Sequence, residues 1–165
     1  MGLFNLFNKS NKSKKSSSEF NQINENCNSI FEKVFNECRL DFGREMVEIM
    51  NMKSRLLEVV NSENTYTPAQ GLLAKKFLEL FTVYLKIIKV YVSLKKGNSN
   101  EHRDLQALES IEEKINRVYS LINELNRQFY LSSDEVSSIS SCDDIINEAE
   151  ALSNIVKSGY LNNSN

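Results

Sequence analysis

The sequence is poor in the residues that interrupt regular structure. It has 1 proline, 5 glycines and no tryptophan among 165 residues, so turn signals are too sparse for the many short strands of a β-sandwich or barrel. The length and a hydrophobic content of 41% are those of one ordinary domain with a substantial core. These absences favour an all-α fold.

Residues that commonly bind metals or act as catalytic bases are also scarce. The only histidine is His102, and the 3 cysteines include no CxxC pair, so no zinc or iron–sulfur ligand set is recognisable. His102 lies in the polar stretch NSNEHRDL, which is typical of an exposed helix start. The isolated glycines form no phosphate-binding loop. We therefore expect no catalytic, cofactor-binding or metal-binding residues; a non-catalytic protein is the favoured interpretation, with enzymatic activity left open.

The cysteines and the hydrophobic runs bear on location. Cys27, Cys38 and Cys142 are not the even set of a small secreted domain, so we expect reduced thiols and a cytoplasmic protein. No segment has the roughly 18 to 20 consecutive apolar residues that span a bilayer. The N-terminus also lacks the order of charged and apolar residues that marks a signal peptide.

Hydrophobic periodicity predicts helices along most of the chain. The first runs from about residue 20 to 62, and its apolar positions are Ile23, Cys27, Ile30, Val34, Cys38, Met46, Val47, Met50, Leu56, Leu57 and Val60. Gly43 is a weak point near its middle. The segment is therefore either one long rod or two abutting pieces.

The stretch TPAQ at 67–70 predicts the start of a second helix. Thr67 and Gln70 have the spacing of a capping box, and Pro68 suits the first helical position. Lys95 and Lys96 precede Gly97, as expected at a helix end. Apolar residues occupy most of its circumference, so we expect this to be the most buried helix.

A third helix is predicted from about 101 to 130, with a seam typical of bundles at Leu108, Ile111, Ile115, Val118, Ile122, Leu125 and Phe129. Tyr84, Tyr91 and Tyr119 are interpreted as core residues. A last helix begins near Ser141, with Asp144 as a weaker capping partner. The expected fold is an all-α antiparallel bundle of about four main helices, elongated if the first helix is a single rod.

The first 18 residues differ from the rest of the chain. They carry a charge of +4 and no acid, so the remainder carries −6 and a nucleic-acid-binding body is not expected. Residues 8–18, NKSNKSKKSSS, are predicted to be a flexible linker. We therefore divide the chain into a tail, residues 1–18, and a bundle domain, residues 19–165. The candidate contact residues of the tail are Leu3, Phe4, Leu6, Phe7, Lys9, Lys12, Lys14 and Lys15.

The segments IEEKINRVYSLINELNRQFY and CDDIINEAEALSNIVKSGYL resemble the closing helices of the 5-bromo-4-chloroindolyl phosphate hydrolysis family, the XpaC-like proteins. The matching positions are Ile111, Glu112, Asp144, Ile145, Leu152, Gly159 and Leu161, with Tyr66, Pro68, Leu73 and Tyr91 upstream. The family's Tyr-Leu-Pro-Thr is reduced here to Tyr-Thr-Pro. The resemblance implies a bacterial helical protein, cytoplasmic or membrane-associated, linked to phosphate-ester hydrolysis and tellurite resistance. It implies no catalytic residue.

Three interpretations of the tail stay open. Its apolar residues form an interfacial helix on an anionic membrane, or Phe4 and Phe7 dock in the groove of a protein partner, or the tail is disordered and its apolar residues dock on the bundle or on nothing. Either kind of binding indicates a non-catalytic helical binding or scaffold protein of bacterial type, peripheral at the inner membrane face in the first case. Homo-oligomerisation is left open.

Overall fold

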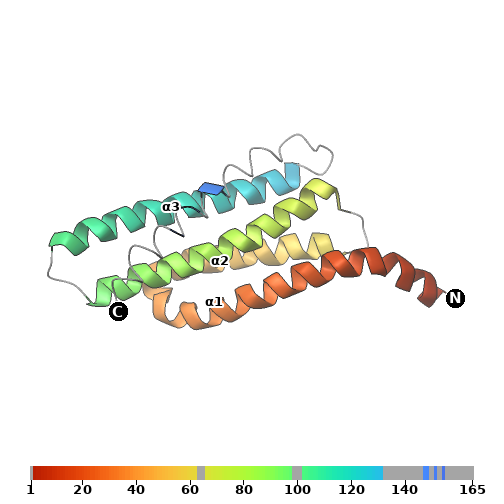
Figure 1. Cartoon of the computed structure of the whole chain (residues 1–165), viewed down its shortest axis with the longest axis horizontal. Helices are drawn as coiled ribbons and strands as arrows, with labels where there is room; N and C mark the ends of the chain where they lie inside the picture. Colours follow the sequence, from red (N-terminus) through yellow and green to blue (C-terminus); the bar gives the residue numbers. More distant parts are fainter. Residues whose placement is uncertain are drawn as a thin grey trace.

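The computed structural model has three α-helices in the part of the chain that it describes: α1 (Gly2–Asn61), α2 (Pro68–Gly97) and α3 (His102–Leu131) (Figure 1). The structure describes residues 2–62, 66–97 and 102–131 together with residues 147, 148, 151 and 154, and side chains within 20–62, 66–96, 105–131 and those four positions. These residues include no strand. The predicted all-α class is confirmed.

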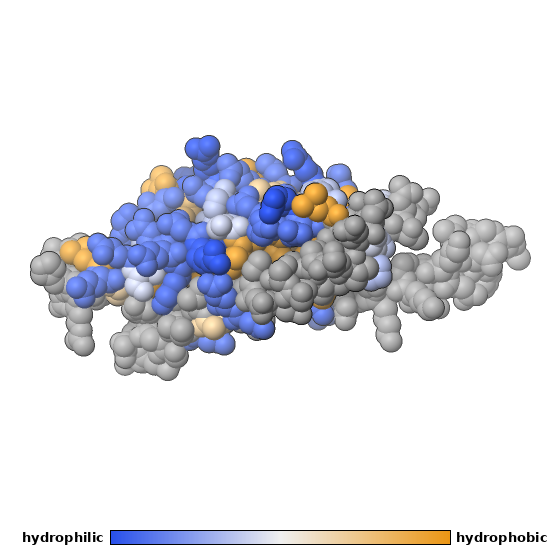
Figure 2. All heavy atoms as spheres, turned by 90° about the horizontal axis from the view of Figure 1, so that it is seen from above, coloured by the Kyte–Doolittle hydropathy of each residue, from blue (hydrophilic) through white to orange (hydrophobic). Residues whose placement is uncertain are grey.

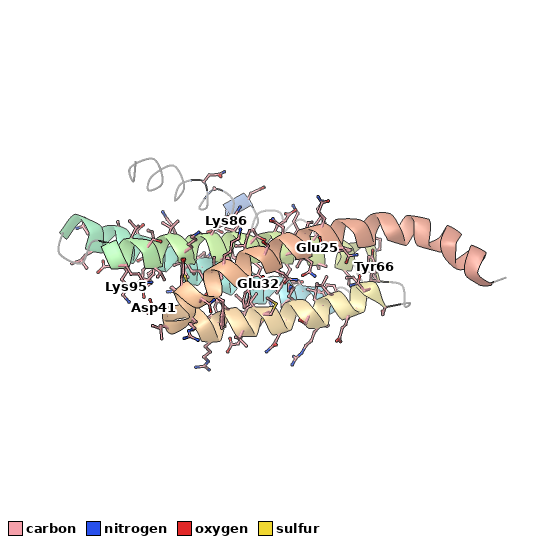
Figure 3. The ribbon with its side chains drawn as sticks, turned by 90° about the horizontal axis from the view of Figure 1, so that it is seen from below. Glu25, Glu32, Asp41, Tyr66, Lys86 and Lys95 are labelled. Atoms are coloured by element: carbon pink, nitrogen blue, oxygen red, sulfur yellow. The ribbon has the colours of Figure 1, made fainter. Side chains whose placement is uncertain are left out.

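Helix α1 folds back on itself instead of forming one straight rod (Figures 1 and 3). Lys53 Nζ donates a hydrogen bond of 2.5 Å to Asn24 Oδ1, 29 residues away, and in a straight helix these residues would be about 43 Å apart. The midpoint between these two residues falls between Cys38 and Arg39, and the midpoint of a second hydrogen-bonded pair, Lys53 and Asn28, falls between Leu40 and Asp41. We call residues 2–38 the first arm, residues 39–43 the bend and residues 44–61 the second arm. Of the two predicted alternatives the structure has two antiparallel pieces, and Gly43 lies in the bend that joins them.

The two arms, α2 and α3 run in alternating directions. The first arm is parallel to α2, because Phe20 packs against Tyr66 at one end and Phe42 packs against Tyr91 at the other. Helix α3 is antiparallel to α2, since Gln70 Nε2 donates to the carbonyl of Phe129. The short connections at the bend and before Pro68 therefore join antiparallel neighbours, as expected of a helical bundle.

The core lies along α2, which the sequence predicts to be the most buried helix, and this is confirmed. The largest fully buried side chains of α2 are Leu73, Phe77, Leu78, Leu80, Phe81, Tyr84, Leu85 and Ile87. The predicted seam of α3 is buried from Ile111 to Phe129, while Leu108 is half-buried. Val47 is the exception in α1, because 44% of it is exposed and its neighbour Ile49 is fully buried instead.

The predicted capping box at the start of α2 is confirmed. Thr67 N–H donates to Gln70 Oε1 at 3.1 Å, and Gln70 N–H donates to Thr67 Oγ1 at 3.1 Å. Pro68 is the first residue of the helix, as expected. Two backbone donors at the helix start are therefore satisfied by side chains.

The sequence predicts a linker near the start of the chain and a fourth helix near its end. Helix α1 begins at Gly2, so the backbone of residues 8–18 is helical where the composition predicts a linker. The division of the chain at residue 18 stays a prediction. The predicted fourth helix from Ser141 falls largely outside the described residues, and the number of four stays a prediction too. Glu148, which is described, forms an ion pair with Arg117 of α3 at 3.3 Å.

Candidate functional sites

The first candidate site is the beginning of α1, where the sequence places all eight contact residues of the tail. These residues lie on continuous helical backbone, and this part of α1 extends beyond the ends of the other helices (Figure 1). Their side chains are outside the described residues. The first buried residue of α1 in the described part is Phe20, whose ring meets Tyr66 at 6.2 Å. Because the backbone at the start of α1 projects past the other helices, it is placed to make contacts outside the bundle (Figure 1).

Helical backbone fixes how these eight positions are distributed around the axis. At 100° per residue, Leu3, Phe4, Leu6 and Phe7 fall within an arc of about 160°. Lys9, Lys12 and Lys15 fall outside this arc, and Lys14 falls within it about two turns further along. A helix with one apolar side followed by cations has the pattern of an interfacial segment.

The second candidate is a polar cluster buried between the two arms of α1. Lys53 is only 3% exposed, and its Nζ donates hydrogen bonds to Oδ1 of Asn24 and of Asn28. Among the residues that the structure describes, no carboxylate pairs with it. Burial lowers the pKa of Lys53 below its ordinary value of 10.5, because an ammonium loses its hydration in the core.

The thiol of Cys27 belongs to the same cluster. Its pKa is raised by burial, which outweighs the opposing effects of the Lys53 charge and of a hydrogen bond with Thr82. Thr82 comes from α2, where its hydroxyl also donates to the carbonyl of Leu78 at 3.0 Å. The cluster thus joins both arms of α1 and α2.

Chemically, the cluster favours a role in helix pairing. A thiol of raised pKa is a poor nucleophile, and Cys27 and Lys53 are both buried. A polar residue within an apolar seam fixes the register of paired helices. The cluster was not predicted from the sequence, although the sequence contains a signal for it. Lys53 is four residues after Ile49 and three before Leu56, in line with the apolar stripe.

A third polar group links the second arm to α3. Tyr119 O–H donates to Glu48 Oε2, and the Tyr119 carbonyl accepts a bond of 2.9 Å from Asn123. The pKa of Tyr119 is raised, first by burial and then by the bond to Glu48. Tyr84 is buried beside Tyr119, whereas Tyr119 and Tyr91 are half-buried at the edge of the core. The interpretation of Tyr84 as a core residue is confirmed.

The bend lies at the end of the bundle where α2 finishes. Asp41 and Lys95 form an ion pair of 3.6 Å there, and Figure 3 shows the two residues at the same end. Leu40 is 94% exposed at the bend. Elsewhere the face seen in Figure 2 is mainly hydrophilic, with small hydrophobic spots over the described residues. In the bend, Asp41 is therefore paired with Lys95 of α2, and Leu40 is exposed to solvent.

Other kinds of site are absent from the residues that the structure describes. No group of three or more metal-binding side chains occurs in the described part of the chain, and no described helix is long and apolar enough to cross a membrane. His102 is the first residue of α3, as predicted for a helix start. Cys27 and Cys38 are free thiols.

No protein-family model, no curated protein and no solved structure matches the chain. The resemblance to the XpaC-like family stays a prediction.

Proposed function

We propose that the protein is a non-catalytic helical binding or scaffold protein that associates with anionic membrane surfaces through residues 2–18 at the start of α1. The observation that supports this most is the position of those residues on helical backbone that projects beyond the other helices (Figure 1). Their apolar residues share one side of the helix, and their charge is +4.

The charges and the apolar side have separate roles in this proposal. Leu3, Phe4, Leu6 and Phe7 enter the boundary between head groups and acyl chains, where burial of apolar area supplies binding energy. The four lysines lie near anionic head groups, and each contributes about 1 kcal/mol. We place the protein in the cytoplasm, at the inner face of the membrane; the free thiols of Cys27 and Cys38 are consistent with a reducing compartment.

The test measures sedimentation of the full chain with vesicles that contain anionic lipid and with purely zwitterionic vesicles. We expect binding to the anionic vesicles that weakens as salt rises. Phe4→Glu should abolish most of it by placing a charge on the apolar side. Leu40→Glu is the matched control, because it makes the same kind of change at a residue that is 94% exposed at the bend.

Two further variants separate the contributions. Changing Lys9, Lys12, Lys14 and Lys15 to serine should weaken binding and flatten its dependence on salt. Deletion of residues 1–18 should abolish binding and remove only the helix signal of the deleted turns. Unfolding of the remaining bundle should be nearly unchanged, because the start of α1 projects beyond the other helices (Figure 1).

Several outcomes would contradict the proposal. An intact protein that ignores anionic vesicles at low salt rules out the membrane role. Capture of a soluble protein by the full chain, lost on deletion of residues 1–18, would favour a protein groove instead. Turnover of a chromogenic phosphate ester that survives repurification and disappears with one substitution would favour the hydrolytic alternative.

A further inference from the structure

The bend of α1 makes an unusual connection between antiparallel helices. Two antiparallel helices are ordinarily joined by a loop of about two to five residues, often through a residue with left-handed φ. Here α1 is helical without interruption from Gly2 to Asn61, and no described residue has a positive φ, Gly43 included. The chain therefore reverses direction with no loop.

The two arms also share one apolar stripe. The buried residues of both arms are Phe20, Cys27, Val34, Cys38, Met46, Ile49, Lys53, Leu56, Leu57 and Val60. At 100° per residue these positions fall within one arc of about 140° across the bend, which is the width of the apolar face of an ordinary amphipathic helix. The sequence is thus compatible with a straight α1 of about 90 Å as well as with the folded-back form.

We propose that α1 straightens at the bend and exchanges its first arm with a second copy of this chain, giving a domain-swapped dimer. A short connection favours exchange, because opening it relieves the tight reversal while the exchanged contacts are remade between chains. A straight α1 in a single chain would expose Phe20, Cys27 and Val34, which are buried in the folded-back form. A second copy offers the identical partner surface.

The polar cluster fixes the register of the exchanged arm. In the folded-back form Lys53 bonds to Asn24 and Asn28 of its own chain. In the dimer the same bonds join Lys53 of one copy to Asn24 and Asn28 of the other. An arm shifted along the seam would leave the buried ammonium without acceptors, which is strongly unfavourable. This proposal concerns the core and does not depend on membrane binding by residues 1–18.

The experiment starts from the full chain, unfolded and refolded at micromolar and at millimolar concentration. Size-exclusion chromatography with light scattering should show a 19.0 kDa monomer and a species of twice that mass, whose fraction rises with concentration. Refolding equal amounts of isotope-labelled and unlabelled chain identifies the exchange. The dimer should show contacts between Lys53 of a labelled chain and Asn28 of an unlabelled one, and the monomer should not.

An insertion tests the role of the bend. Gly-Ser-Gly-Ser between Leu40 and Asp41 supplies a loop for the reversal, and we expect it to lower the dimer fraction at a given concentration by roughly tenfold or more. The same four residues inserted after Ser62, between α1 and α2, are the matched control and should leave the dimer fraction unchanged.

Three results would overturn the proposal. The first is a wild-type chain that stays monomeric at every concentration. The second is a dimer without contacts between Lys53 and Asn28 of different chains, which would indicate association through the surface. The third is equal loss of dimer on insertion at the bend and after Ser62.

Discussion

The buried ammonium of Lys53 predicts that its replacement by methionine stabilises the fold at pH 7. Methionine keeps an unbranched side chain that is one atom shorter and removes a charge whose desolvation opposes folding by several kcal/mol. The change also removes hydrogen bonds to Asn24 and Asn28, each worth about 1.5–3 kcal/mol. Both amides are half-buried, so water can replace part of that loss. We expect Lys53→Met to raise the free energy of unfolding by about 1–2 kcal/mol.

The difference in unfolding free energy between Lys53→Met and the wild type depends on pH. Burial lowers the pKa of Lys53 in the folded state, and the unfolded chain has the ordinary value of 10.5. Between the lowered pKa and 10.5 the unfolded state binds more protons, so the stability of the wild type rises with pH. The wild type gains about 1.4 kcal/mol for each unit of pKa by which folding lowers the value. The advantage of Lys53→Met should therefore shrink as pH rises from 7 towards 10.5.

Urea unfolding followed by helical circular dichroism measures both effects. Lys33→Met, an exposed position on the same helix, controls for the loss of one positive charge. Repeating the comparison in Cys27→Ala chains removes the neighbouring thiol, whose ordinary pKa of 9.0 lies within this pH range and is raised by burial. A difference that stays constant from pH 7 to 10.5, or a loss of more than about 3 kcal/mol at pH 7, would refute the description of Lys53 as a desolvated cation.

Three further predictions follow from local contacts. Gly71→Ala should destabilise the fold, because the added Cβ would lie 2.8 Å from Tyr66 Cε2. Gly43→Ala should be tolerated or should stabilise the fold by up to about 1 kcal/mol, because its Cβ would lie at an ordinary contact distance of 3.5 Å from Arg39 Cβ. Thermal unfolding of the two variants compares these effects. Thr67→Ala should cost about 1 kcal/mol of unfolding free energy by removing one bond of the capping box, and an unchanged urea midpoint would contradict this. Burial, and next the charge of Glu37, raises the pKa of Cys38 to about 11, so its alkylation in the folded protein should be slow at pH 8 and become fast in denaturant.

Much of the secondary structure was predictable because its causes are local. The capping residues Thr67 and Gln70 contact each other across three positions, and the seam of α3 repeats every three or four residues. Such signals lie within one or two turns of the chain. The composition of residues 8–18 predicted the backbone conformation less well, because it indicated a linker where the backbone is helical.

The sequence by itself determined that the chain is helical, where α2 begins, that α2 is the most buried helix and which face of α3 is buried. Only the tertiary structure decided that α1 folds back, that Val47 is exposed while Ile49 is buried, and that Lys53 lies between Asn24 and Asn28. The apolar stripe of α1 continues in phase through the bend, so periodicity fits a straight rod and a folded-back pair equally well. The two forms differ in contacts between residues more than twenty positions apart, and no pattern of neighbouring residues records such contacts.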